Sequence, residues 1–365
     1  MPASCAMKKQ HASRPAPLLL FGFSKWKTFI RDWFPENDVI FGCVNAWPLE
    51  FDLYWKRRIL RDPRTSVLAW QYKGPPQLKE FCARHGIPFQ YVEDGFLRSV
   101  ALGALRVPPL SLTFDTQDMY FNARAPTDLE DILRNYDFEN DPSLVQRART
   151  AREQLLARRL SKYNSGHSLD IASVYGEKMR RRVLVIGQVE RDASIAYGCA
   201  TKITNNDLVR LARMENPDAQ VIYKPHPEVL KGTAEAKSNP EHVRDIAMIL
   251  KQDISLADAL ETVDHIYTIT SLSGFEALLR GITVTTVGCP FYSGWGLTDD
   301  RQPHPRRGRA LSIDEIFAAA YILYAKYLDP VTKTPIEIEQ ALEVLARMRA
   351  EQMEAGRPHL RAVPP

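Results

Sequence analysis

The chain lacks the features that would assign it to a class at once: paired cysteines, a long hydrophobic run and a strong charge of one sign. Its 365 residues include five cysteines, which lie far apart and form no CxxC pair: Cys5, Cys43, Cys82, Cys199 and Cys289. This odd and scattered set argues against a disulfide framework and against a zinc site. It is typical of a protein of the reducing cytoplasm.

No stretch of the sequence approaches the roughly 18 consecutive apolar residues that span a bilayer. The apolar run near the start, Leu18–Phe23, is too short for a secretory signal, and no clear cleavage site follows it. Residues 1–16 are expected to form a disordered leader. Any contact with a membrane is therefore expected to be peripheral.

The charge is almost balanced, with 48 Lys and Arg residues against 44 Asp and Glu residues. The net charge of +4 is too small to indicate a nucleic-acid binder. The basic residues form small clusters, which are usually solvated and less often hold an anionic substrate or a phospholipid surface. These clusters are 56–58, 180–182 and 306–307.

Short apolar runs alternate with helical segments, and this alternation predicts parallel βαβ units. The predicted strands are 18–23, 39–44, 66–70, 88–92, 182–187, 220–223, 265–269 and 284–287. Helices are predicted between them and at 144–159, 312–327 and 336–350, the second of these starting with a capping box of Ser312 and Glu315. The fold class is therefore α/β, with two Rossmann-like domains facing a cleft. We expect an N-terminal domain over 17–178 that closes with helices, a C-terminal domain over 179–330, and a helix and tail over 331–365.

Polar motifs follow the predicted strands, where open α/β sheets bind ligands. Glu93 and Asp94 leave one strand and enter a glycine turn, so that one acid could serve as a general base; the alternative is a turn with solvated acids. Asp192 follows the strand 182–187, where a carboxylate could meet an anomeric carbon or simply cap a helix. His226 lies between two prolines that fix the backbone, and it could donate to a phosphate.

A fourth motif, Thr270-Ser271-Leu272-Ser273-Gly274, combines hydroxyl groups and a glycine at a strand-to-helix turn. This pattern favours a phosphate site over a plain helix cap, and it matches neither a Walker A nor a GxGxxG motif. Glu276 lies close enough to bind ribose hydroxyls. The aromatic and glycine-rich loop 290–299 could cover a sugar or a base. There is no DxD motif and no metal-ligand spacing, so we expect no metal and no cofactor.

Several long blocks resemble the capsular polysaccharide biosynthesis family typified by KpsC and KpsS, the β-Kdo (3-deoxy-D-manno-oct-2-ulosonic acid) transferases. The similar blocks are GFSKWK (22–27), EDGFLRSVALGA (93–104), GQVERDASIAYG (187–198), YKPHPEV (223–229), TSLSGFEALLRG (270–281) and PFYSGWGLTDD (290–300). The chain looks like a single KpsC-type module, whereas KpsC proteins usually carry two. The resemblance implies a GT-B-like fold and a retaining transfer of Kdo from CMP-Kdo to a phosphatidylglycerol-type glycolipid at the inner membrane, together with other capsule assembly proteins.

The resemblance also implies roles for individual residues. Asp192 is the expected nucleophile, and Glu93 or Asp94 the acid/base. The nucleotide and its phosphate are assigned to His226, Lys224, Pro227, Ser271, Ser273, Gly274 and Glu276. The Kdo carboxylate needs a cation, for which Arg98 and Lys224 are candidates. Further substrate contacts are expected from Ser99, Gln188, Ser194, Tyr292 and Trp295.

Two other interpretations stay open at this point. One is another CMP- or UDP-sugar transferase of the same architecture, such as a sialyltransferase. The other is a non-catalytic partner in capsule assembly or export. A module that had lost activity would be expected to lose at least one of Glu93, Asp192 and His226, and all three are present.

Overall fold

The computed structural model describes residues 14–44, 48–100, 107–162, 164, 170–232, 238–252 and 254–355. Most of the predicted leader and the last ten residues of the predicted tail lie outside these ranges. The chain divides into two compact units, residues 1–90 and 91–365, and the division falls within strand β4 (Phe89–Asp94). The boundary predicted near residue 178 divides the chain into two ligand-binding domains, and it stays a prediction.

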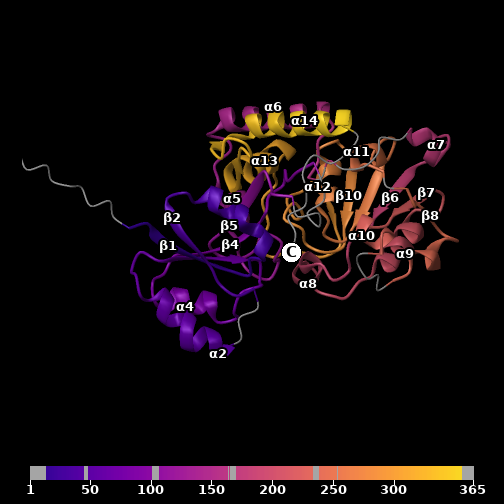
Figure 1. Ribbon diagram of the computed structural model, residues 1–365. Helices are drawn as coiled ribbons and strands as arrows, with labels where there is room; N and C mark the ends of the chain where they lie inside the picture. The colour runs from indigo at the N-terminus through magenta and orange to yellow at the C-terminus, as the bar shows by residue number, and fades with distance from the viewer. Residues whose placement is uncertain are drawn as a thin grey trace, which may run out of the picture. The chain divides into compact units, whose positions relative to one another are not determined.

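The first unit contains three parallel strands. Strand β1 (Ala16–Phe21) lies between β2 (Asn37–Phe41) and β3 (Ser66–Trp70), and all three confirm predicted strands. The predicted helix 25–33 forms as a 3-10 helix (Lys25–Phe29) followed by α1 (Ile30–Trp33). A continuous helical segment comprises α2 (Pro48–Glu50), the π-helical turn η2 (Phe51–Trp55) and α3 (Lys56–Ile59), and α4 (Leu78–Arg84) follows (Figure 1).

Strands β4, β5 (Ser111–Asp115), β12 (Ala325–Leu328) and β13 (Pro335–Ile336) pair antiparallel, which corrects the expectation of parallel βαβ units throughout. Strand β4 pairs with β5, β5 with β12, and β12 with β13. The sequence analysis predicted none of β5, β12 and β13 as strands. Their partners come from distant parts of the chain, so local alternation of strands and helices could not reveal them.

The helix predicted over 312–327 is only partly correct. Its capping box of Ser312 and Glu315 is present, and α13 (Ile313–Phe317) continues as a π-helical stretch to Tyr324. The last predicted turn is instead strand β12, because the backbone of residues 325–327 pairs with residues 111–113 of β5. The helical spacing of apolar residues over 312–327 gives no indication that the end of this segment pairs with the distant strand β5.

The second sheet is parallel and contains the predicted strands β6 (Arg182–Ile186), β7 (Gln220–Lys224), β9 (His265–Thr268) and β10 (Thr283–Thr286). Short strands β8 (Met248–Ile249) and β11 (Asp299–Asp300) complete the order β11-β10-β9-β6-β7-β8. The chain runs outward from β6 to β8 and then returns to β9 on the other side of β6. The strand order therefore reverses between β6 and β9, which is where open α/β sheets leave a crevice for ligands.

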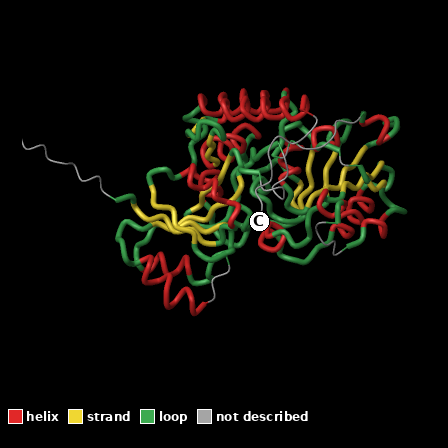
Figure 2. Tube along the Cα trace, viewed as in Figure 1, coloured by secondary structure: helices red, strands yellow, loops and turns green. Residues whose placement is uncertain are grey.

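Helices cover both parts of the second unit. Near the parallel sheet these are α7 (Ile171–Tyr175), α8 (Ala193–Gly198), α9 (Asn205–Glu215), α10 (Pro227–Leu230), α11 (Leu256–Ala259) and α12 (Leu272–Leu278). Helix α5 (Asp128–Asn135) packs on the π-helical stretch, and α6 (Pro142–Ala157) packs against α13 and α14 (Ile338–Ala355). Figure 2 shows α6 and α14 as the long helices along one edge, and both confirm predicted helices.

Candidate functional site

Three polar side chains meet where the strand order reverses. Gln188 follows β6 and Thr270 follows β9, and these two strands are direct neighbours. The Gln188 Nε2 atom donates to Thr270 Oγ1 (3.2 Å), and Gln188 Oε1 accepts from the Thr270 backbone N–H (2.8 Å). The Ser194 hydroxyl lies 3.0 Å from Thr270 Oγ1. The structure thus brings the predicted residues Gln188 and Ser194 together through Thr270.

Asp192 lies at the start of α8, directly beside this group. Its Oδ1 accepts a hydrogen bond from the Ser194 backbone N–H (2.7 Å), and the side chain is exposed. The preceding loop is held by buried Glu190, whose Oε1 accepts from the Asn205 backbone N–H (2.7 Å) and from the Ser238 hydroxyl (2.6 Å). Asp192 therefore combines a fixed backbone with a carboxylate that a substrate can reach.

His226 follows β7 and is half-buried. Its Nδ1 accepts from the Glu228 backbone N–H (3.2 Å), so the neutral ring carries its proton on Nε2. Burial lowers the pKa of His226, and the charge of Lys224 acts in the same direction, whereas Glu228 and Asp192 oppose the shift. Near neutral pH the ring is accordingly a neutral Nε2–H donor within electrostatic reach of Asp192. Pro227 is the first residue of α10.

The predicted phosphate turn is held from one side by the loop 290–299. Ser271 caps α12 and accepts from the Ser273 backbone N–H (3.2 Å), and both side chains are half-buried. The Tyr292 hydroxyl donates to the Ser271 carbonyl oxygen and packs on Gly274, where an added Cβ would lie 2.3 Å from the Tyr292 oxygen. Only glycine fits at position 274 without displacing this ring.

Two predicted contact residues are enclosed in the protein. Trp295 is fully buried, and its Nε1 donates to the Phe291 carbonyl oxygen (2.8 Å). Glu276 is 3% exposed and accepts from the Lys162 backbone N–H (3.1 Å). Burial raises the pKa of Glu276, although nearby Arg280 opposes the shift. Contacts of these two side chains, and of buried Tyr292, with a substrate stay predictions.

Asp94 and Arg98 form a buried ion pair at the end of β4. Arg98 Nε donates to Asp94 Oδ2 (2.6 Å), while its Nη1 and Nη2 donate to the Ser99 hydroxyl (2.9 Å) and the Val107 carbonyl oxygen (2.9 Å). With Arg98 only 1% exposed, every nitrogen of its guanidinium is directed at the protein. Glu93 Oε1 accepts from the Asp94 backbone N–H (2.9 Å). Asp94 Oδ1 is buried and has no hydrogen-bond partner among the described atoms.

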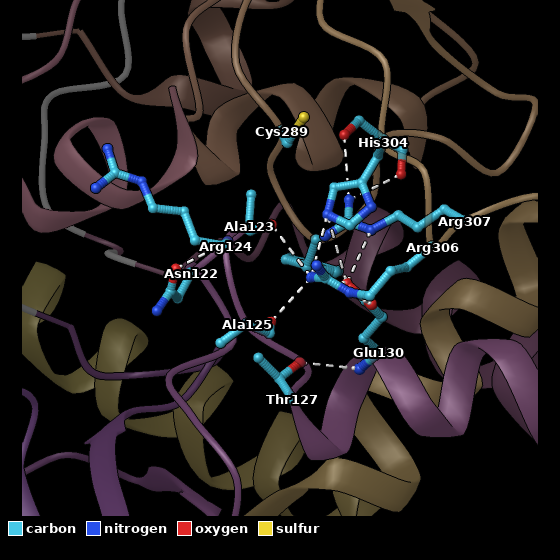
Figure 3. A network of polar contacts seen from close by, with 12 residues as sticks. Asn122, Ala123, Arg124, Ala125, Thr127, Glu130, Cys289, His304, Arg306 and Arg307 are labelled. Carbon is cyan, nitrogen blue, oxygen red and sulfur yellow. Dashed lines mark hydrogen bonds and ion pairs between the residues drawn. The ribbon is translucent and has the colours of Figure 1, made fainter. Parts of the chain in front are cut away.

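The buried carboxylate of Glu130, in helix α5, binds side chains at the end of the loop 290–307 and so fixes this loop to α5 (Figure 3). Arg306, Arg307 and His304 surround the carboxylate, with Arg306 Nε 2.5 Å from Oε1. Arg307 Nη1 also donates to the carbonyl oxygens of Pro290 and Ser293. Burial alone would raise the pKa of Glu130, but the two arginines, Arg306 first, outweigh it and lower the pKa.

The sequence analysis missed three residues that hold the site: Thr270, Asn205 and Glu130. Thr270 opens the recognised hydroxyl motif and could have been chosen by position. Asn205 follows the Thr204 cap of α9, and its Oδ1 accepts from the Gln188 backbone N–H (3.0 Å). Glu130 carries no local signal, because its partners are more than 170 residues away.

The described residues contain neither a cluster of metal-binding side chains nor a helix that could span a membrane. Among these residues, no three or more His, Cys, Asp or Glu side chains are grouped so that they could hold a metal ion. In the same part of the chain, no helix has the length and apolar character needed to cross a bilayer.

Comparison with known proteins identifies the class. Residues 65–327 match the family model described as "Capsule polysaccharide biosynthesis protein". The lipopolysaccharide-processing protein LpsZ of Rhizobium meliloti is 52% identical over 342 residues, covering 92% of this chain and 76% of LpsZ. The capsule polysaccharide modification protein LipA of Neisseria meningitidis serogroup B is 42% identical over 295 residues, covering 81% of this chain and 41% of LipA. The chain belongs to the capsule polysaccharide biosynthesis family.

Two solved structures are similar over almost their full length. The β-Kdo 2,4 transferase of Thermosulfurimonas dismutans KpsC has a TM-score of 0.76 at 31% identity, covering 92% of this chain and 99% of that chain. The β-Kdo 2,7 transferase of the same KpsC has a TM-score of 0.70 at 30% identity, covering 91% and 99%. The predicted resemblance to KpsC is confirmed, and so is an α/β fold with two sheets.

Proposed function

We propose that this chain is a retaining glycosyltransferase that moves Kdo from CMP-β-Kdo to a glycolipid acceptor and so builds the β-Kdo linker of a capsular polysaccharide. The observation that carries the proposal is the similarity, over nearly the whole chain, to two Kdo transferase chains. The proposal includes a GT-B-like pair of Rossmann-like domains and transfer without a metal ion. It also places the protein on the cytoplasmic side of the inner membrane as a peripheral protein.

The first chemical step is assigned to Asp192. Its exposed carboxylate would attack the anomeric carbon C2 of Kdo, the bond from C2 to the phosphate oxygen would break, and CMP would leave with the electron pair. A phosphate monoester is a stable leaving group and needs no proton from an acid. The Nε2–H of His226 would instead stabilise the developing charge, together with the turn at Ser271 and Ser273.

The second step needs a base and is assigned to Asp94. The acceptor hydroxyl oxygen would attack C2 of the glycosyl–enzyme, its proton would pass to Asp94, and the Asp192 carboxylate would leave. Two inversions give overall retention. Asp94 is favoured over Glu93 because the Arg98 guanidinium holds the Asp94 carboxylate in a fixed position through Oδ2. Arg98 and Lys224 stay the candidates for the cation that meets the Kdo carboxylate.

The test is transfer by the purified protein with CMP-Kdo generated in situ and two acceptors, a lipid-like glycoside with one β-Kdo and one without, both in EDTA. A gain of one Kdo by mass, with retained β configuration by NMR, is expected. Asp192→Ala should abolish transfer, because it removes the carboxylate that would form the covalent intermediate. Full activity of Asp192→Ala would refute the nucleophile assignment.

The remaining outcomes separate the alternatives. Transfer only after a divalent metal is added would refute metal independence. Transfer of another sugar from its CMP donor, with none from CMP-Kdo, would point to a different donor specificity. A folded protein that binds CMP but transfers nothing to either acceptor would favour a non-catalytic role in assembly.

A further inference from the structure

Exposed apolar side chains are concentrated in one short part of the first unit. The described residues include ten large hydrophobic side chains that are exposed, and half of these lie between residues 44 and 60: Val44, Leu49, Leu53, Tyr54 and Leu60. The others, such as Met179 and Val331, are far apart in sequence. Single exposed apolar residues are ordinary, but a group of them in one segment indicates a surface that is covered in use.

Four of the five, Leu49, Leu53, Tyr54 and Leu60, lie on the helical segment 48–59 or directly after it, and this segment packs on the first unit through its other face. Phe51, Trp55 and Ile59 are buried, and the rings of Phe51 and Trp55 contact Phe21 of the central strand. On the outer side, Leu49 is 71% exposed and Leu53 is 65% exposed.

Helical spacing places the exposed leucines together. Leu49 and Leu53 are four residues apart, and Leu60, which follows α3 in helical conformation, comes seven residues after Leu53. Residues at these spacings share one face of a helix. The outer face therefore presents an apolar stripe that is one side chain wide and about three turns long.

Basic residues border this stripe. Arg57 is exposed and falls beside the leucines by the same helical spacing, Arg61 is exposed in the turn that follows α3, and Lys56 pairs with Asp52 (2.6 Å). Residues 48–64 contain five basic and three acidic side chains. An apolar stripe bordered by arginines has the two features by which an interfacial helix binds a bilayer: leucines that enter the headgroup region and cations that meet anionic lipids.

We propose that the outer face of the segment 48–60 docks on the surface of an anionic phospholipid bilayer. The proposal deepens the proposed function and rests on it, since a transferase with a lipid-linked acceptor works at such a surface. A bilayer is a better occupant than a second copy of the chain. Exposed Arg57 and Arg61, with the excess of basic over acidic side chains in residues 48–64, give the face a positive charge, which anionic headgroups complement and a second copy of the same face does not.

The experiment is flotation of the full-length protein with two kinds of vesicle, one of pure phosphatidylcholine and one of phosphatidylcholine and phosphatidylglycerol in equal parts. The wild type should float with the anionic vesicles and more weakly, or not at all, with the neutral ones. Leu49→Ser/Leu53→Ser/Leu60→Ser should lower the partition coefficient at least about tenfold. Arg57→Gln/Arg61→Gln should lower it about thirtyfold at low salt.

Two control variants remove the same kinds of exposed side chain at other positions of the protein. Met179→Ser/Met214→Ser/Val331→Ser loses three exposed apolar side chains, and Lys202→Gln/Arg244→Gln loses two exposed charges. Both should bind vesicles like the wild type. Circular dichroism checks that every variant is folded, and the substituted side chains are exposed, so folding should be unchanged.

Several results would overturn the proposal: no binding of the wild type to anionic vesicles, unchanged binding of the leucine variant, or an equal loss in the controls. A wild-type dimer that the leucine substitutions convert to a monomer, without a change in vesicle binding, would assign the face to a second copy. Transfer to a water-soluble acceptor should be normal in all variants. If the wild type transfers no sugar to this acceptor, the proposed function is contradicted. The result of the flotation experiment is not affected by that outcome.

Discussion

Glu130 and Arg306 are 176 residues apart in sequence and form a two-pronged ion pair, with Nε 2.5 Å from Oε1 and Nη2 3.2 Å from Oε2. The same guanidinium donates to the carbonyl oxygens of Ala123 and Ala125. Arg307 shares the carboxylate and reaches the loop that carries Tyr292. One buried carboxylate thus connects the segment 122–130 to the loop beside the phosphate turn.

Glu130→Gln should lower the free energy of unfolding by about 3–5 kcal/mol, because it leaves the buried Arg307 without its countercharge. Urea denaturation followed by circular dichroism measures this change. The control is Glu80→Gln, which removes an exposed ion pair with Arg84 and should change stability little. Equal stability of Glu130→Gln and wild type would show that the cluster is not needed to hold the loop.

The contribution of two buried histidines to stability should fall as the pH drops from about 6.5 toward 4. Burial, with nearby arginines, lowers the pKa of both His304 and His265 from 6.5 to about 4. The unfolded chain therefore takes up these protons at a higher pH than the folded one, so that the stabilisation is fully present above pH ~6.5 and is lost below it. Each group contributes at most ~3 kcal/mol.

The measurement is the urea midpoint between pH 8 and pH 4. His304→Gln should flatten the slope in the acid range, and His242→Gln, at an exposed histidine, should leave it as in the wild type. If the urea midpoint of His304→Gln depends on pH as it does in the wild type, the pKa of His304 is the same in the folded and the unfolded chain.

Asp94→Asn should allow the first chemical step and block the second. Departure of CMP needs no base, whereas the acceptor hydroxyl must lose a proton, so turnover should fall about 10²–10⁴-fold. Incubation with CMP-Kdo should then leave one Kdo on the protein, visible by intact mass spectrometry. The comparison variant is Glu93→Gln, which should turn over faster than Asp94→Asn and accumulate no adduct. The reverse pattern would assign the base to Glu93.

Gly274→Ala should destabilise the protein by about 1–3 kcal/mol. The new methyl group would lie 2.3 Å from the Tyr292 hydroxyl oxygen, and this ring is fully buried and cannot move aside. Tyr292→Phe removes that oxygen. In a double-mutant cycle by thermal unfolding, Gly274→Ala should therefore cost less in the Tyr292→Phe background. Purely additive effects would show that strain against Tyr292 is not the cause.

Strands β6, β7, β9 and β10 of the parallel sheet, and the polar motifs that follow strands of this sheet, were predicted from the sequence alone. The run RVLVIG forms β6 because five consecutive residues are buried on both faces of the sheet, and apolar β-branched residues suit that environment. The capping box of Ser312 and Glu315 formed as predicted, because its hydrogen bonds join residues three apart. Such features depend on residues that are close together in the chain, so they can be predicted from the sequence.

Only the tertiary structure decided which of these side chains remain available to a ligand. Arg98 matched a motif, yet each nitrogen of its guanidinium donates a hydrogen bond within the protein, and Trp295 lies inside the core. The end of the helix at Tyr324 and the cluster around Glu130 likewise depend on residues far away in sequence. Local spacing specifies how a segment folds, but burial and pairing arise only when distant segments pack together, and they decide which groups remain open to chemistry.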